Sequence, residues 1–331
     1  MSENYTGFVR LISFDNNFLI AICFDSSSLA KIFEIKDLEA GIRMIEAKCP
    51  HLFIALENKK VMHFEVEKET ATLKSTWTVQ KSVTSMYFIR EKNILLASDK
   101  FGDVFTFQIG DSEGKLVMGQ ISMILDMVYD EQRNFIITSD RDERSMCMGF
   151  SLCRFVSALA LEGDTLVSGG GDDYVTIWNM NSYEKTEVLV KKDGMSDDIT
   201  VAKIILSENK AFLLLERSNL IVVIDIESHK VEYLEMPNIL TSLSSVNNCI
   251  FSLSIDGVLY KINSSLTYEA LSFKTEEFFE KIEITNDFDF SREFTLHNMR
   301  KSLNFGKKGK SKEDDQDEIE EENSNKKIKA N

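Results

Sequence analysis

Two glycine-rich stretches are the first candidates for chemistry, because glycine loops can cradle phosphate groups. One runs from Gly110 to Lys115, but it is one residue shorter than a P-loop, and Leu116 stands where that motif requires a magnesium-binding hydroxyl. The other, Gly169–Gly171, leads into a strand-like run and not into the helix N-terminus that binds a pyrophosphate. Neither stretch predicts a nucleotide site, and the second is typical of a tight turn after a strand.

The histidines and cysteines are too scattered to indicate a metal site. The four histidines are His51, His63, His229 and His297, and only His51 has a cysteine close by in sequence, Cys49. A structural zinc site needs four such ligands, usually in two close pairs. We therefore expect the histidines to lie at the surface or at strand ends. We also expect no cofactor, no metal and no catalytic site in this chain.

The charge balance argues against a broad nucleic-acid surface. The 331-residue chain has 38 Lys and Arg against 54 Asp and Glu, which gives a formal net charge of −16. Proteins that hold nucleic acid through its phosphates need a positive surface. The longest apolar runs, such as residues 18–24, are strand-length and much shorter than the roughly 20 residues of a membrane-spanning helix. We expect no membrane segment, and if RNA is involved, a basic partner should make most of the contact.

The elements that would position functional residues follow one repeating pattern. Seven times along the chain, apolar-alternating runs of strand length are interrupted by a turn of small or acidic residues. The turns before the third run of each unit fall near residues 27, 59, 102, 142, 172, 218 and 256. Their mean spacing of about 38 residues is close to the roughly 40–45 residues of a WD-type blade. The sequence predicts an all-β fold, a seven-bladed WD-repeat β-propeller.

The domain organisation follows from where this pattern stops. No linker rich in Pro, Gly or Ser divides the chain, so we expect one propeller over residues 1–267. Residues 268–305 break the repeat and are expected to pack on the propeller rim. Residues 306–331 are highly charged and poor in apolar side chains, which predicts a disordered tail. The lysine pairs Lys307–Lys308 and Lys326–Lys327 are weak targeting signals that favour a nuclear location.

A run of charges replaces the usual turn residues in the fourth unit. Residues 139–144 read Ser-Asp-Arg-Asp-Glu-Arg, with five consecutive charged side chains. Arginine pairs bidentately with carboxylates and is frequent at interface hot spots, so one interpretation is a partner-binding patch. The other interpretation is a solvated turn without a function of its own.

In this context the chain resembles a known family. The stretches LLASDKFGDVFTF, GQISMILDM, FIITSDRDE and FVSALALEGDTLVSGGGDDYVTIWN occur in this order and spacing. They strongly resemble the WD-repeat non-catalytic subunit of tRNA (guanine-N7-)-methyltransferase. The likeness is close over residues 95–179 and extends to the other blades only by pattern. The SDRDE string is specific, whereas SGxxD followed by tryptophan is shared by most WD repeats.

The resemblance implies a scaffold without catalytic residues, working in a heterodimer. A separate catalytic subunit would bind S-adenosylmethionine and methylate N7 of a guanosine in the variable loop of tRNA. The tRNA would be contacted indirectly, through that partner. Transferred position by position, the partner-binding residues are Lys100 and Asp103 in one turn and, in the charged turn, Asp140, Arg141, Asp142, Glu143 and Arg144.

Two departures from the family pattern concern the same unit. Gly119–Gln120 stands where relatives carry Gly-His, and no second Gly-His pair follows. Only about a dozen residues, 143–154, link the charged turn to the next unit, where relatives have a full strand and a loop. Either this blade is trimmed at its outer edge or the sequence lacks a segment.

Two other functions remain open at this stage. A generic WD-repeat adaptor would recruit peptides or substrates to a ubiquitin ligase or a signalling assembly. An unrecognised propeller hydrolase would need a catalytic site for which we find no support in the sequence. Variable-loop methylation separates these from the scaffold, because only the scaffold is required for it.

Overall fold

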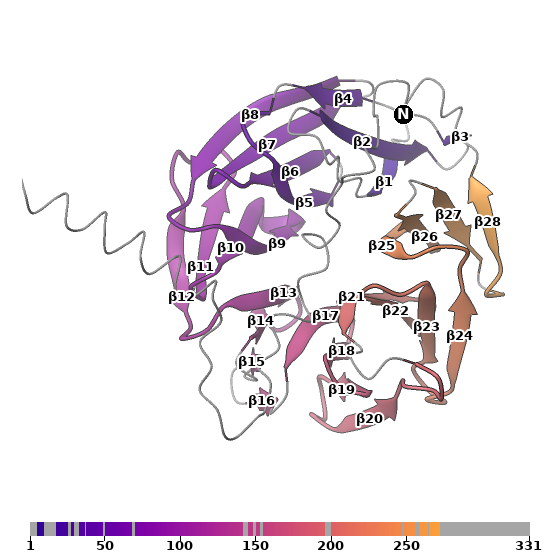
Figure 1. The fold of residues 1–331 in the computed structure, drawn as a ribbon. Coiled ribbons are helices and arrows are strands. Elements are labelled where there is room, and N and C mark those ends of the chain that lie inside the picture. The colour runs from indigo at the N-terminus through magenta and orange to yellow at the C-terminus, as the bar shows by residue number, and fades with distance from the viewer. Residues whose placement is uncertain are drawn as a thin grey trace, which may run out of the picture. The chain divides into compact units, whose positions relative to one another are not determined.

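The described part of the chain is built almost entirely of antiparallel strands (Figure 1). The computed structural model describes residues 5–9, 18–25, 28–29, 33–36, 38–48, 50–67, 70–141, 145–147, 150–152, 155–195, 200–246, 248–255, 258–263 and 265–271. All of them belong to one compact unit, residues 1–300, and the second unit, residues 301–331, lies outside them. Within these ranges the only helix is a 3₁₀ turn, Arg90–Lys92.

Seven four-stranded sheets contain these strands, and five of them are complete blades in which consecutive strands pair side by side. Their strands are β5 (Ile42–Lys48), β6 (His51–Leu56), β7 (Lys60–Glu67) and β8 (Thr70–Thr78); β9 (Val83–Ile89), β10 (Ile94–Asp99), β11 (Asp103–Gln108) and β12 (Lys115–Gly119); β17 (Val156–Glu162), β18 (Thr165–Gly170), β19 (Tyr174–Asn179) and β20 (Lys185–Leu189); β21 (Val201–Ser207), β22 (Lys210–Leu215), β23 (Leu220–Asp225) and β24 (Val231–Glu235); β25 (Leu240–Val246), β26 (Cys249–Ser254), β27 (Leu259–Ile262) and β28 (Tyr268–Leu271).

The other two sheets are less regular. In the first, β2 (Phe18–Asp25) pairs with β1 (Tyr5–Val9) and also with two short strands, β3 (Ser28–Leu29) and β4 (Phe33–Lys36). In the other, β13 (Ile124–Asp130) and β14 (Phe135–Asp140) are followed by outer strands of three residues each, β15 (Ser145–Cys147) and β16 (Phe150–Leu152). The register between β14 and β15 is a single pair, Thr138 with Met146. The outer edge of the sheet with the charged turn therefore consists of two short strands.

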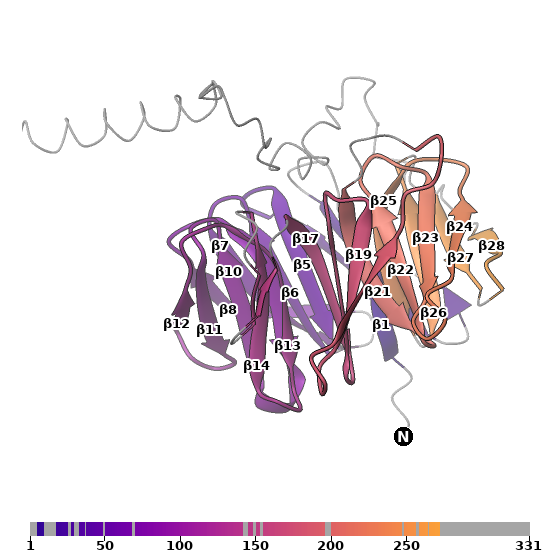
Figure 2. The same ribbon diagram turned by 90° about the horizontal axis from the view of Figure 1, so that it is seen from below.

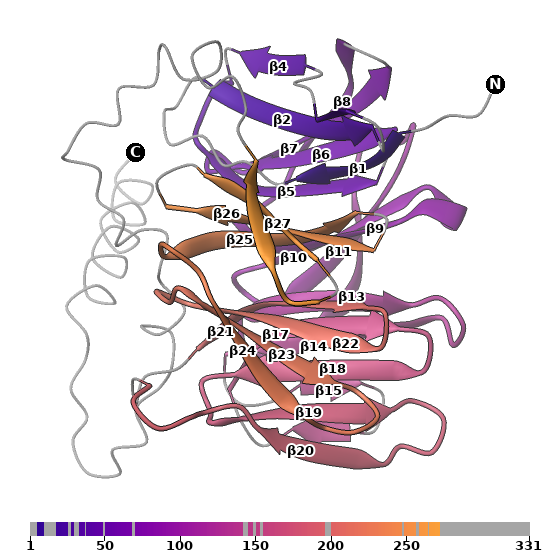
Figure 3. The ribbon, with the colours of Figure 1, turned by 90° about the vertical axis from the view of Figure 1, so that its right-hand side faces the viewer.

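The sheets close on one another through their innermost strands. Strand β1 packs against both β5 and β25, and between these the innermost strands follow in the order β5, β9, β13, β17, β21 and β25. Figure 2 shows the strands of successive sheets standing side by side, and Figure 3 shows the sheet of β21–β24 with its outer strand β24 toward the viewer. This ring of antiparallel sheets is a propeller, so the all-β propeller prediction is confirmed. The prediction of seven blades is confirmed only in part, because five of the sheets are complete blades.

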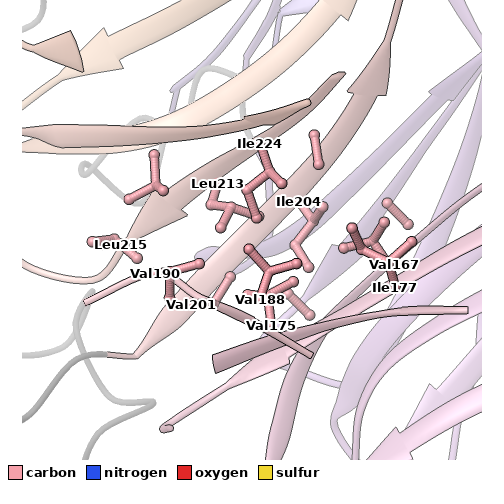
Figure 4. Close-up of a cluster of buried hydrophobic side chains, with 14 residues drawn as sticks. Val167, Val175, Ile177, Val188, Val190, Val201, Ile204, Leu213, Leu215 and Ile224 are labelled. Carbon is pink, nitrogen blue, oxygen red and sulfur yellow. The ribbon is translucent and has the colours of Figure 1, made fainter. Parts of the chain in front are cut away.

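Most clusters of the hydrophobic core among the described residues lie between neighbouring blades. One cluster combines side chains of β17–β20 with side chains of β21–β23, among them Val167, Ile177, Ile204 and Leu213 (Figure 4). The second strand of each complete blade is buried on both faces, which is why these strands read as continuous apolar runs such as KAFLLL in β22. Neighbouring blades therefore share buried apolar side chains.

Four of the seven expected turns coincide with turns between strands in the described residues. The turns expected near residues 59, 102, 172 and 218 lie between the second and third strands of complete blades. The expected end of the propeller at residue 267 is too early, because β28 pairs with β27 from Tyr268 to Leu271. The remainder of the rim extension predicted over residues 268–305, from residue 272 onward, and the tail predicted over residues 306–331 lie outside the described residues.

Candidate partner-binding surface

The first predicted turn, between β10 and β11, is held from inside by Asp99. Its Oδ1 accepts hydrogen bonds from the backbone N–H of Phe101 at 2.8 Å and of Asp103 at 3.2 Å. The Asp99 side chain is buried, and the Gly102 backbone takes a left-handed φ of +92°. An aspartate that caps its own turn in this way fixes the backbone of the residues around it. The turn therefore presents Lys100 and Phe101 in one conformation.

Lys100 and Asp103 have different positions in this turn. The backbone N–H of Lys100 donates to the carbonyl of Ser82 at 3.1 Å, and its Nζ lies 5.7 Å from the centroid of the Phe101 ring. Asp103 begins β11 and pairs in register with Gly119 on β12. Both side chains are half-buried.

The loop that connects β12 to β13 joins the first turn to the second. Gln120 donates its backbone N–H to the Gly102 carbonyl at 2.8 Å, and its Nε2 donates to Thr138 Oγ1 on β14 at 2.5 Å. At the other end of the loop, the Met123 carbonyl accepts the backbone N–H of Arg141 at 2.9 Å. The two predicted partner-binding turns, about 40 residues apart in the sequence, therefore lie around one loop. We call this region, made of residues 99–103, 119–123, 140 and 141, the turn surface.

The charged turn itself is described only in part. Asp140 ends β14 and is 3% exposed, so it lies beneath the surface and not on its rim. Arg141 is half-buried. The predicted residues Asp142, Glu143 and Arg144 lie outside the described residues. The four that are described come together on the turn surface, and their role in partner binding stays a prediction.

Gln120 is the residue that the family resemblance places at the histidine of a Gly-His pair. Its amide nitrogen reaches the hydroxyl of Thr138 on the neighbouring sheet, which keeps one hydrogen bond across this junction. The amide oxygen is buried and has no hydrogen-bond partner among the described residues. In the next blade the tryptophan retains a strand contact, since Trp178 Nε1 donates to Ser168 Oγ at 3.1 Å.

Asp126, a residue without a predicted role, supports the turn surface from the innermost strand β13. Its Oδ1 accepts from Ser85 Oγ at 3.2 Å and from the backbone N–H of Met127 at 2.9 Å. Its Oδ2 accepts the backbone N–H of Leu159 at 2.9 Å, and its own N–H donates to Ser139 Oγ at 3.1 Å. One carboxylate thus joins β9, β13 and β17, in three successive blades. A lone acid within the apolar run Ile124–Tyr129 is the signal that could have identified it.

A second polar junction lies at the opposite end of the same sheets. Arg133 forms ion pairs with Asp130 at 2.8 Å and with Asp164 at 2.5 Å, and it donates to Asn181 Oδ1 at 2.5 Å. Arg133 precedes β14, whereas Asp164 and Asn181 lie in the two hairpin turns of the next blade. The blade with short outer strands is therefore attached to the next blade at both ends.

The expectation that the histidines lie at the surface or at strand ends is wrong for His63, which is buried within β7, whereas His51 begins β6. His51 and His63 meet across β6 and β7, with 3.0 Å between His51 Nδ1 and His63 Nε2. His63 is 1% exposed and its ring stacks with Phe53 and Trp77. Burial, helped by the nearby His51, lowers the pKa of His63 to about 4. Register across two strands brought the two rings together, which residue spacing alone did not reveal.

The two glycine-rich stretches lie at a turn and at the end of a strand. Residues 110–114, which spell Gly-Asp-Ser-Glu-Gly, form the turn between β11 and β12, so the serine is not presented on the strand-to-helix turn of a hydrolase nucleophile. Gly169 and Gly170 end β18, and a Cβ on Gly170 would lie 1.7 Å from the Phe155 carbonyl oxygen. Close approach of the chain explains that glycine. No helix in the described ranges is long and apolar enough to span a membrane.

Comparisons with known proteins concern the same part of the chain. Residues 110–254 match the family described as "tRNA methyltransferase TRM82 WD40 domain". A "tRNA (guanine-N(7)-)-methyltransferase non-catalytic subunit wdr4" from Danio rerio is 29% identical over 53% of this chain and 47% of the relative. The subunit WDR4 from Homo sapiens is 31% identical over 33% of this chain and 30% of the relative. The chain thus aligns with less than half the length of these relatives.

Solved structures show the fold. The WD40 β-propeller domain of Doa1 superimposes with a TM-score of 0.56 at 13% identity, over 72% of this chain and 84% of that domain. The computationally designed Ika8 protein gives a TM-score of 0.57 at 14% identity, over 82% and 87% of the two chains. Together with the family match, these likenesses confirm that the chain is a WD40 propeller that resembles the non-catalytic subunit of tRNA (guanine-N7-)-methyltransferase.

Proposed function

We propose that this chain is the non-catalytic scaffold subunit of a tRNA (guanine-N7-)-methyltransferase. The observation that carries the proposal is the family match over residues 110–254, because that segment contains the 119–123 loop and the charged turn. In the proposed heterodimer, the catalytic subunit binds S-adenosylmethionine and methylates N7 of a variable-loop guanosine. The propeller supplies no reacting group and holds that subunit in its active conformation.

The geometry of the turn surface supports this role. Both turns are tied to one loop by backbone hydrogen bonds, and Asp126 joins the strands beneath them across three blades. A preordered surface loses little conformational entropy when a partner binds. Charged side chains at such a surface give specificity, and removing one partner of a buried charge pair costs about 2–5 kcal/mol of binding free energy.

Three finer proposals accompany the scaffold role. The net charge of −16 favours tRNA contact through the catalytic subunit and not through a broad face of the propeller. The lysine pairs at 307–308 and 326–327 favour action in the nucleus. The cyclic order of innermost strands supports counting the sheets of β1–β4 and β13–β16 as blades, which makes the ring seven-bladed.

Co-purification followed by an activity assay tests the proposal. The full chain, tagged and co-expressed with the tRNA guanine-N7 methyltransferase of the same organism, should retain that enzyme, and the complex should methylate tRNA faster than the enzyme alone. Deleting the gene should abolish N7 methylation in the variable loop. Normal methylation after deletion would instead support the adaptor for a ubiquitin ligase or a signalling assembly.

The charged turn provides a sharper test. Arg141→Glu and Asp142→Lys should each abolish co-purification. Each substitution gives the turn a charge of the same sign as the group on the catalytic subunit that pairs with the wild-type residue. The melting temperatures of both variants should stay close to that of the wild type. Lys115→Glu reverses a side-chain charge on the exposed strand β12; this variant is the control and should co-purify normally. Unfolding of the two turn variants would favour the solvated structural turn.

A further inference from the structure

We infer that Phe101 and Ile121 form an apolar anchor through which the turn surface holds the catalytic subunit, an inference that rests on the proposed function. Ile121 is 93% exposed and Phe101 is 52% exposed. Interface hot spots are characteristically large apolar or aromatic side chains near the centre of a contact, enclosed by a polar rim. Phe101 lies in the first of the two turns whose charges the sequence singled out, and Ile121 lies in the loop that joins them.

The backbone beneath the two side chains is fixed on both sides. Phe101 precedes Gly102 and Ile121 follows Gln120, and the Gln120 N–H donates to the Gly102 carbonyl at 2.8 Å. A Cβ on Gly102 would lie 2.4 Å from the Ser122 carbonyl oxygen, so the turn and the loop are in close contact. Ile121 is therefore exposed on an ordered loop, because Gln120 before it and Met123 after it are held by backbone hydrogen bonds.

Cations surround the aromatic half of the anchor. Lys81 Nζ lies 4.2 Å from the centroid of the Phe101 ring, and Lys100 Nζ lies 5.7 Å from it. Both ammonium groups lie within the distance at which a ring face attracts a cation. A complementary partner surface offers an apolar pocket with Asp or Glu at its edge. This is the chemistry we assign to the matching surface of the catalytic subunit.

The same blade contains a matched control for exposure. Leu116 and Val117 on the outer strand β12 are 59% and 49% exposed, comparable with Phe101. They belong to the edge of the blade, whereas Phe101 and Ile121 belong to its turn end. If exposed apolar area alone governed binding, the residues at the blade edge and those at the turn end would contribute similarly to affinity. If the turn surface is the docking site, only the turn-end residues contribute.

The test is an affinity measurement on the full chain with its purified catalytic subunit, for example by biolayer interferometry. Ile121→Ser and Phe101→Ser should each raise Kd about tenfold or more, the loss expected of a hot-spot residue. Leu116→Ser should leave Kd within about twofold of the wild type, as expected outside a hot spot. Each melting temperature should match that of the wild type. Should Ile121→Ser lower it, Ile121→Thr keeps the β-branched shape while removing apolar surface.

The charge requirement is tested separately. Raising the salt concentration should weaken wild-type binding, because exposed charge pairs are screened. The double variant Lys81→Gln, Lys100→Gln should bind more weakly at low salt and respond less to added salt. Unchanged affinity of both serine variants, with wild-type binding intact, would overturn the anchor but leave the scaffold proposal standing. If the wild type itself does not bind the catalytic subunit, the scaffold proposal fails and the anchor fails with it.

Discussion

At the scale of single residues, a polar side chain links three blades of the ring. The Asp126 carboxylate accepts hydrogen bonds from Ser85, Met127 and Leu159, which lie on the innermost strands of successive blades. Asp126→Ala should lower the free energy of unfolding by about 2–4 kcal/mol, because two backbone N–H groups and a hydroxyl lose their acceptor. Urea denaturation measures this loss. Asp111→Ala, which removes an exposed carboxylate paired with Lys115, is the control and should have no measurable effect.

The His51–His63 pair predicts a pH dependence of stability. The pKa of His63 falls from its usual 6.5 to about 4 in the folded protein, mainly because the ring is buried. As the pH drops below about 6.5, the unfolded chain binds a proton at His63 that the folded protein does not bind. The free energy of unfolding should therefore fall between pH 6.5 and about 4, and His63 should contribute no slope above that range.

Urea midpoints measured at intervals from pH 7.5 to pH 4.5 test this prediction. The variant His63→Phe, whose ring can stack with Phe53 and Trp77 as the imidazole does, should show a shallower decline with acid. An equal decline in the variant and the wild type would assign the pH dependence to other groups.

At the scale of elements, Gly102 shows how one turn depends on a neighbouring loop. Gly102 and Gly110 have similar left-handed φ values, +92° and +99°, but a Cβ on Gly110 would meet nothing within 4 Å. Both alanine variants acquire the same type of backbone strain, about 1–3 kcal/mol. Only Gly102→Ala also pushes against the carbonyls of Gln120 and Ser122.

We therefore expect Gly102→Ala to lower the melting temperature more than Gly110→Ala, and to weaken binding of the catalytic subunit as well. Thermal denaturation and the affinity assay give the two readings. Equal losses in both variants would show that φ strain alone accounts for the effect and that the contact with the 119–123 loop is unimportant.

The same scale separates what the sequence could predict from what it could not. Turns such as that of Gly102 were predicted because glycine and acidic residues mark a local backbone requirement. The short outer strands β15 and β16 were anticipated because only about a dozen residues, 143–154, link the charged turn to the next unit. The contacts of Asp126 and the meeting of His51 with His63 depend on which side chains face each other across strands. Spacing within one segment has no information about such pairings.

At the scale of the whole molecule, the charged C-terminal residues are expected to act independently of the propeller. The composition of residues 306–331 predicts no contribution to the core, while their lysine pairs favour nuclear import. A chain ending at residue 305 should keep the wild-type melting temperature and the ability to bind the catalytic subunit. It should accumulate less in the nucleus, which fluorescence microscopy of tagged chains would measure. A lower melting temperature would contradict the separation of tail and propeller.

The contact between β1 and β25 has a consequence for the order of folding. Within each sheet, strands pair with strands that are close in sequence, so every sheet can form from local contacts at high rate. The contact between β1 (Tyr5–Val9) and β25 (Leu240–Val246) instead brings together segments more than 200 residues apart. Closing this contact therefore costs more loop-closure entropy than any other contact between neighbouring blades of the ring. We expect an arc of formed blades to precede the closed circle, with the joining of β1 to β25 as the slow kinetic phase.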